Sequence, residues 1–189
     1  MVATRTKKKD AVIETATLLF SEQSYLSVGV DKIIAESNVA KMTFYKYFPS
    51  KENLIEAVLE NRRLYIQYSL EELVNEKNLP MDKLQAIFNW FESWFFSEDF
   101  HGCMFIKATE EFPDNLKFRK VSETYKVWLH GLVNNILESM TQKSAHDLTA
   151  LILVIIDGLI VKANMALLAP EEVKLTWNCI IKMIDLPKA

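Results

Sequence analysis

Residues 28–51 read VGVDKIIAESNVAKMTFYKYFPSK, and this stretch is the most informative part of the chain. It contains two short helical patterns, Asp31 to Ser37 and Lys41 to Tyr47, with only three residues between them. Asn38 stands at the break, and asparagine tolerates the left-handed conformation that ends many helices better than most residues other than glycine. Two helices joined by so short a turn predict a helix-turn-helix.

The second helix of this pair predicts one buried face and one solvent face. Phe44 and Phe48 are four positions apart, so we expect both of them in the core. The solvent face holds Met42 together with cations and hydroxyls, which suit phosphates and base edges. Lys51 and Tyr45 are expected to contact phosphates, Lys51 at a helix N-terminus where anions are favoured. The candidate DNA-contacting residues are Lys41, Thr43, Tyr45, Lys46, Tyr47 and Lys51.

A longer ordered motif surrounds this stretch. The matching residues are Ala16, Leu19, Phe20, Val30, Ile33, Val39, Thr43, Tyr45, Phe48, Ser50, Lys51 and Leu54. In this order they resemble the DNA-binding signature of the TetR-type bacterial repressors, "A-x-x-L-F", "V-x-x-I-A-x-x-A-G-V-S-x-x-T-x-Y-x-x-F" and "S-K-x-x-L". Asn38 replaces the usual glycine, Ile34 and Ser37 replace alanines, and Ala40 replaces a serine. Ala40 lacks the hydroxyl that could cap the helix and contact a phosphate.

The resemblance implies an all-α protein of about nine helices. It implies a helix-turn-helix DNA-binding domain at residues 1–51 and an effector-binding and dimerisation domain at residues 52–189. It also implies a homodimer in which segments 145–168 and 171–184 pack against their mates as a four-helix interface. The two recognition helices would then lie about 34–36 Å apart and read a palindrome in double-stranded DNA. A small-molecule effector would shift the connecting helix, 51–76, and move the two DNA-binding domains of the dimer apart.

The composition favours helices and one basic end. Half of the 189 residues are apolar, and there are only four glycines and five prolines. Residues 1–51 carry eight Lys or Arg against five Asp or Glu, whereas residues 52–189 carry fourteen against twenty. A basic N-terminal part on an otherwise acidic chain suggests that this part binds a polyanion. The basic run from Arg5 to Lys9 either lies along a phosphate backbone or only keeps the chain in solution.

Large aromatic residues are concentrated in the body of the chain. The connecting helix is expected to bury a stripe that includes Tyr65 and Tyr68. Segments 81–97, 103–112 and 115–140 carry more aromatic side chains than simple helix pairs require. The candidate effector pocket consists of Tyr68, Phe91, Trp94, Phe95, Phe105, Glu111, Tyr125 and Trp128, with Asn164 as a further polar group. An apolar or aromatic effector is expected. The alternative is that the aromatic residues only fill the core of a constitutive DNA-binding protein.

Segment 145–168 is apolar almost all round and is expected to be buried on nearly every side. Asp157 interrupts its apolar run, and a carboxylate is expensive to bury without a partner. It is expected either to bond across helices or reach solvent, or to make a specific contact at the dimer interface or pocket. The run from 150 to 161 is too short to span a bilayer, so a soluble protein is expected. The two cysteines, which form no CxxC pair, suggest reduced thiols in a cytoplasmic protein.

The residues that could carry chemistry form no recognisable site. His101, His130 and His146 make no metal-ligand pair, and Cys103 and Cys179 are far apart in the sequence. We therefore expect two reduced thiols, no metal, no cofactor and no enzymatic activity.

An enzyme built in a helical shell is the remaining alternative. It would need a cleft in which Cys103 or Glu111 has a perturbed pKa.

Overall fold

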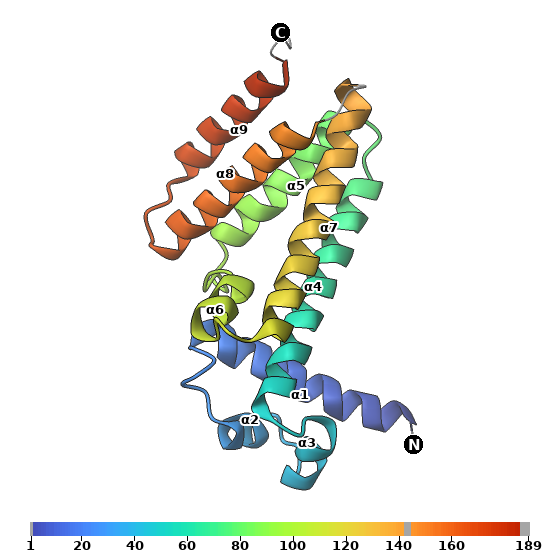
Figure 1. The fold of residues 1–189 in the computed structure, drawn as a ribbon, viewed down its shortest axis with the longest axis vertical. Helices are drawn as coiled ribbons and strands as arrows, with labels where there is room; N and C mark the ends of the chain where they lie inside the picture. The colour runs from blue at the N-terminus through green and yellow to red at the C-terminus, as the bar shows by residue number, and fades with distance from the viewer. Residues whose placement is uncertain (1, 142–144, 186–189) are drawn as a thin grey trace. The chain divides into compact units, whose positions relative to one another are not determined.

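The computed structural model describes the backbone of residues 2–141 and 145–185 and the side chains of residues 7–140 and 145–185. Within these ranges the chain forms nine α-helices and no strand, which confirms the predicted fold class (Figure 1). The helices are α1 (Val2–Glu22), α2 (Val30–Glu36), α3 (Lys41–Tyr47), α4 (Lys51–Asn75), α5 (Pro80–Phe95), α6 (Met104–Glu111), α7 (Leu116–Thr141), α8 (His146–Asn164) and α9 (Pro170–Asp185).

The chain divides into two compact units, each made of two segments. The first unit comprises Met1–Ile66 and Cys103–Tyr125, and the second comprises Gln67–Gly102 and Lys126–Ala189. Helices α4 and α7 therefore each contribute residues to both units. The division at residue 51, which assigns DNA binding and effector binding to different parts of the chain, stays a prediction.

In the first unit, α2 and α3 pack against α1 (Figure 1). The apolar stripe of α1 is buried, with Val12, Ala16 and Phe20 fully covered. The helix begins at Val2. The side chains of residues 1–6 lie outside the described ones, so the phosphate contact expected of the basic run from Arg5 to Lys9 stays a prediction.

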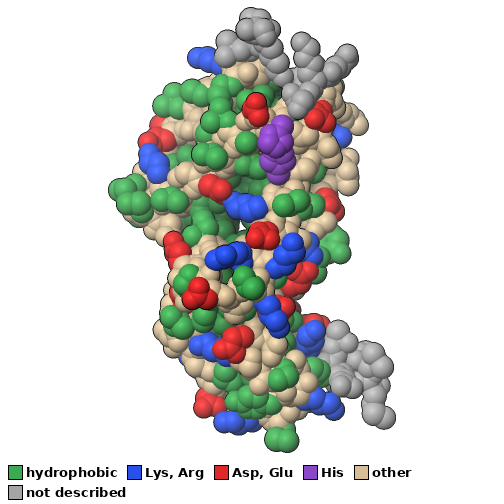
Figure 2. Space-filling model, viewed as in Figure 1, with side chains coloured by type: hydrophobic (Ala, Val, Ile, Leu, Met, Phe, Trp, Pro, Cys, Tyr) green, Lys and Arg blue, Asp and Glu red, His purple; other side chains and the backbone are tan. Residues whose placement is uncertain are grey.

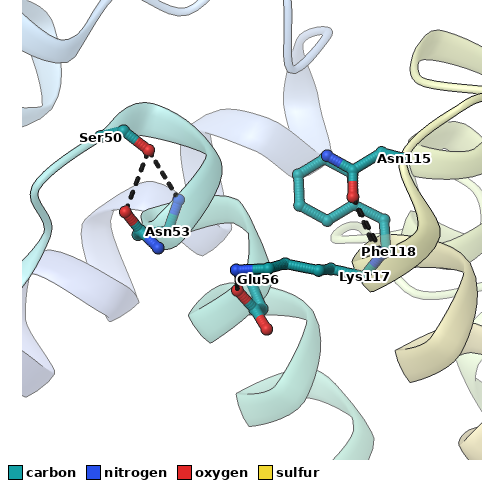
Figure 3. Close-up of polar contacts among 6 residues, drawn as sticks. All are labelled: Ser50, Asn53, Glu56, Asn115, Lys117 and Phe118. Atoms are coloured by element: carbon teal, nitrogen blue, oxygen red, sulfur yellow. Dashed lines mark hydrogen bonds and ion pairs between the residues drawn. The ribbon is translucent and has the colours of Figure 1, made fainter.

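Local hydrogen bonds set the boundaries of the next helices. Asn38 adopts the left-handed conformation, with φ of 52°, as its position in the turn predicted. The Ser50 hydroxyl accepts a hydrogen bond from the Asn53 N–H at 3.2 Å and donates one to the Asn53 Oδ1 at 3.0 Å, so Ser50 caps α4 (Figure 3). Asn115 caps α7 in the same way, because its Oδ1 accepts hydrogen bonds from the N–H groups of Lys117 and Phe118.

The predicted buried stripe of α4 was wrong at two positions. Tyr65 and Tyr68 are 55% and 65% exposed. The buried positions of the helix are Leu54, Ile55, Val58, Leu59, Ile66, Leu70 and Val74. Branched aliphatic side chains recur there at helical spacing, and the tyrosines point away from that face.

In the second unit, α8 packs against α5 and α9 (Figure 1). Asp157 forms an ion pair with Lys126 of α7, so it bonds across helices, and both side chains keep more than a third of their surface exposed. The prediction that segment 145–168 is buried on nearly every side was wrong within this chain. Leu151, Val154 and Val161 are 46%, 66% and 50% exposed.

Helix α8 ends at Asn164, before the predicted end at residue 168. Ala166 adopts a left-handed conformation with φ of 54°. Its N–H donates to the Ala163 carbonyl at 3.0 Å, and the Leu167 N–H donates to the Lys162 carbonyl at 2.9 Å. These bonds satisfy carbonyl groups at the end of the helix and terminate it. Within the described ranges, none of the helices combines the length and apolar character that a bilayer crossing requires.

Candidate nucleic-acid interface

The inward face of α3 fixes this short helix to the first unit. Phe44 is fully buried and Phe48 is 2% exposed, with their ring centroids 5.8 Å apart. Ile33 of α2 and Val39 of the turn are also buried. Both phenylalanines are therefore core residues, as predicted, and the orientation of α3 about its axis is set by them.

The opposite face of α3 is open to solvent. Lys41, Met42, Tyr45 and Lys46 are exposed, whereas Thr43 and Tyr47 are half-buried. The structure thus brings five of the six predicted DNA-contacting residues together on α3, and Lys51 follows at the start of α4. Met42, 84% exposed, belongs to the same surface but was absent from the predicted set. Its place among the solvent-facing residues of the sequence pattern was the signal that could have included it.

Lys41 carries its charge beside a carboxylate of the preceding helix. Its Nζ lies 2.9 Å from the Asp31 Oδ1, and this hydrogen bond raises the pKa of Lys41. Both side chains are largely exposed, so the pair is weak and can open. Lys41 can therefore exchange Asp31 for a phosphate without leaving a buried charge behind.

Lys51 occupies the first position of α4, where the helix dipole favours anions. Its Nζ donates a hydrogen bond to the Leu26 carbonyl at 3.3 Å. Partial burial lowers the pKa of Lys51, against the opposing effect of Glu111 and Glu52. The ammonium is held near the loop that precedes α2, with its remaining hydrogens available to a phosphate.

Helix α6 holds that loop from the other side. The Glu111 carboxylate accepts hydrogen bonds from the backbone N–H groups of Tyr25 and Leu26, at 3.1 and 2.8 Å. The Lys107 ammonium donates to the carbonyl oxygens of Phe20, Ser21 and Gln23 at the end of α1, at 3.3, 2.7 and 3.1 Å. Two side chains of one helix thus satisfy the backbone between α1 and α2. Sequence reasoning missed Lys107, and it considered Glu111 as a group of the effector pocket or of an enzyme site but not as a partner of this loop.

The residues predicted to line an effector pocket fall into groups. In the first unit, Phe105 and Tyr125 are both buried and stack with ring centroids 4.6 Å apart. In the second unit, Phe91, Trp94 and Phe95 of α5 form one aromatic cluster with Phe100, whose ring lies 4.9 Å from that of Trp94.

Two predicted residues of the second unit lie outside that cluster. The Trp128 Nε1–H donates a hydrogen bond to the Glu71 carboxylate at 3.2 Å. Tyr68 is exposed. Asn164, the further polar group considered, is also exposed, and its amide lies beside the backbone of Gly102.

Each unit also contains a cavity of its own. In the first unit, a cavity of about 320 Å³ is lined by Glu14, Thr17, Leu18, Asn61, Arg62 and Tyr65. In the second, a cavity of about 510 Å³ is lined by Leu73, Lys77, Asp82, Gln85, Ala86, Asn89, Trp90 and Ser93. Neither of these two linings includes a residue of the predicted effector set.

Metal-binding side chains are scattered in the part of the chain that the structure describes, where no three His, Cys, Asp or Glu side chains come close enough to hold an ion. His130 and His146 lie side by side with ring centroids 4.9 Å apart, and histidine forms one patch on the face drawn in Figure 2. Cys103 is buried and Cys179 is exposed, and both are free thiols.

A short helix with a buried aromatic face, an exposed face of cations and hydroxyls, and a second helix packed before it define a helix-turn-helix DNA-binding protein. Residues 12–58 match the model of the family described as "Bacterial regulatory proteins, tetR family". Through this match, the DNA-binding region of the chain is identified as that of the TetR family of bacterial regulatory proteins.

The relatives extend this likeness along the chain. IcaR of Staphylococcus aureus strain Newman, the negative transcriptional regulator of the biofilm operon icaADBC, is 25% identical over 161 residues, covering 84% of this chain and 85% of IcaR. The crystal structure of a TetR-family transcriptional regulator from Streptomyces coelicolor matches with a TM-score of 0.85 and 22% identity, covering 95% of this chain and 94% of that one. The reduced form of Escherichia coli NemR matches with a TM-score of 0.80 and 18% identity, covering 92% and 97%. At these identities, the two structural matches establish the fold.

Proposed function

We propose that this protein is a dimeric transcriptional repressor that binds a palindromic operator through α2 and α3. The proposal rests mainly on the outward face of α3, where Lys41, Tyr45 and Lys46 are exposed and take no part in the core. Phe44 and Phe48 are buried and hold the helix in place. Repression is favoured because the similar IcaR is a negative transcriptional regulator.

A row of exposed apolar residues on α8 supports the dimer. Leu151, Val154, Gly158 and Val161 are exposed and follow a spacing of three, four and three residues, which places them on one stripe. A side chain added at Gly158 would meet nothing within 4 Å in this chain, so the stripe leaves room for the backbone of a second helix. On α9, Leu175 is 63% exposed. An apolar stripe of this kind is stable in water when a second copy covers it.

A two-fold dimer of this type would present two copies of α3 to successive major grooves. The two-fold symmetry explains why the operator is expected to be a palindrome, and the separation of the two helices sets its half-sites about one helical turn apart. We assign DNA reading to residues 1–51, with Lys41, Thr43, Tyr45, Lys46, Tyr47 and Lys51 as contacts, and effector binding and dimerisation to residues 52–189.

We propose that the binding of a small apolar or aromatic molecule releases the protein from DNA. The buried aromatic groups of α5, and the stacked pair of Phe105 and Tyr125, are side chains that could separate to admit such a ligand. The ligand would act only if it binds one conformation of the dimer more tightly than the other. This must be the conformation in which the spacing of the two DNA-binding domains does not fit the operator. The second candidate is a constitutive DNA-binding protein, and the close ring contacts among these residues favour it.

The same proposal describes a non-enzymatic protein of the cytoplasm. A regulator that reads chromosomal DNA in a bacterium works where that DNA lies. Its partners would be double-stranded DNA, a second copy of the chain and the effector, and it would need no cofactor.

Selection of bound DNA from a randomised duplex library tests the first half of the proposal. We expect enrichment of two inverted half-sites bound by a dimer, and absence of any enriched sequence would refute it. The second half is tested by adding small aromatic compounds to the complex with the selected DNA. A compound that both raises the melting temperature of the protein and releases the DNA supports an effector. A broad panel with neither effect would favour the constitutive protein.

A further inference from the structure

Met42 occupies the part of α3 that lies farthest from the core of the first unit. It precedes Phe44 by two positions, which corresponds to a rotation of about 200° around a helix. Phe44 is fully buried, and Met42 is 84% exposed. The side chain therefore projects directly away from the packing that holds α3, and it contributes almost nothing to the stability of the free protein.

The neighbours of Met42 leave it as the most prominent side chain of the first turn of α3. Lys41 is engaged by Asp31 at 2.9 Å, and Thr43 is half-buried. Tyr45 and Lys46, three and four positions later, share the face of Met42 and are exposed. An apolar side chain thus stands at the centre of a surface that otherwise carries charge and hydroxyl groups.

Only one feature of a DNA major groove matches such a side chain. Phosphates and most base edges offer hydrogen-bond donors and acceptors, for which a thioether has little to give. The C5-methyl group of thymine is the apolar feature of the groove, and it is read by apolar contact. The unbranched methionine side chain is long and adaptable enough to follow that methyl group.

We propose that Met42 is a specificity-determining residue that reads a thymine methyl group in each half-site. The proposal rests on the function proposed above, because it requires that α3 enters the major groove. It adds one element to that function: the operator carries an A·T pair opposite Met42, and the protein distinguishes this pair by its methyl group.

Replacement of thymine by deoxyuridine tests this directly, because it removes only the methyl group. The probe is the duplex enriched by selection with the unmodified protein, with each thymine changed in turn. We expect one position in each half-site at which the change weakens binding about fourfold, the effect of exposing one buried methyl group. Deoxyuridine at the remaining thymines serves as the control and should leave the affinity unchanged.

The same duplexes measured with Met42→Ala complete the test. In this variant the penalty for deoxyuridine at the sensitive position should disappear, while the melting temperature stays that of the unmodified protein. Met42→Gln keeps the length of the side chain and should shift the selected base at that position toward adenine, which glutamine recognises through paired hydrogen bonds.

Three results would overturn the inference. The unmodified protein could bind all deoxyuridine duplexes as tightly as the thymine duplex, or Met42→Ala could retain the full penalty. Either result refutes the role of Met42 while the protein still selects its operator, so the proposed function stands. If the unmodified protein selects no sequence at all, the proposed function fails and the inference falls with it.

Discussion

The phenol of Tyr25, in the loop after α1, donates a hydrogen bond to the carbonyl oxygen of Met104 in α6 at 3.0 Å. The two residues are 79 positions apart, and both are buried. Burial raises the pKa of Tyr25, so the phenol remains a neutral donor. Together with Lys107 and Glu111, this bond fixes α6 to the segment that leads into the helix-turn-helix.

Replacing Tyr25 with phenylalanine should destabilise the protein by about 1–3 kcal/mol, because the buried carbonyl of Met104 would lose its partner. Urea unfolding followed by circular dichroism measures the change. Tyr68→Phe is the matched control, and it should leave the free energy of unfolding unaltered because Tyr68 is 65% exposed. Equal effects of the two substitutions would contradict the role assigned to Tyr25.

Glu111→Ala should loosen the loop before α2. The N–H groups of Tyr25 and Leu26 donate to this carboxylate, so hydrogen exchange at these two amides should accelerate. Glu111→Gln retains a neutral acceptor and should have a smaller effect. The control is Glu110→Ala, which removes the same charge from the exposed neighbouring position. Unchanged exchange in Glu111→Ala would show that the carboxylate does not hold the loop in solution.

Lys51→Ala should weaken binding to all DNA sequences alike. Loss of one phosphate contact reduces the slope of log affinity against log salt concentration by about one unit. Fluorescence anisotropy with labelled duplex over a range of salt concentrations gives this slope. Lys77→Ala, which removes an exposed charge from the second unit, should not change it. A slope for Lys51→Ala equal to that of the unmodified protein would remove Lys51 from the contacts.

Val154→Glu should convert the proposed dimer into a folded monomer, since a charge would be buried in the apolar stripe of α8. Sedimentation velocity reports the oligomeric state, and circular dichroism verifies that the helices remain. Val127→Glu is the control, because Val127 of α7 is 73% exposed and lies outside the stripe. Charges at Ile156 or Leu159 are less informative, since both side chains are buried within the chain and would unfold it. A Val154→Glu protein that sediments as a dimer would place the interface elsewhere.

Local rules explain which features could be predicted from the sequence. The bounds of α3 were predicted correctly from the spacing of Phe44 and Phe48 and the turn at Asn38. The cap at Ser50 agrees with the preference of hydroxyl side chains for helix starts. Each of these features depends on residues a few positions apart.

Features that depend on distant residues could not be predicted. The bonds from Lys107 and Glu111 join segments more than 80 positions apart, and nothing in the local pattern marks them. The stripe assigned to α4 failed at Tyr65 and Tyr68 because tyrosine was counted as apolar, whereas Ile66 takes the buried position. The early end of α8 depends on a left-handed alanine, which propensity alone does not indicate.

Hydroxyl-radical footprinting of the complex with its selected duplex tests whether two copies of α3 read one palindrome. We expect two protected segments on one face of the DNA, with centres about one helical turn apart, and two chains bound for each duplex. Lys46→Ala should weaken both protections equally. A single protected segment occupied by one chain, or protection that does not depend on the sequence of the duplex, would show that the protein does not read a palindrome as a dimer.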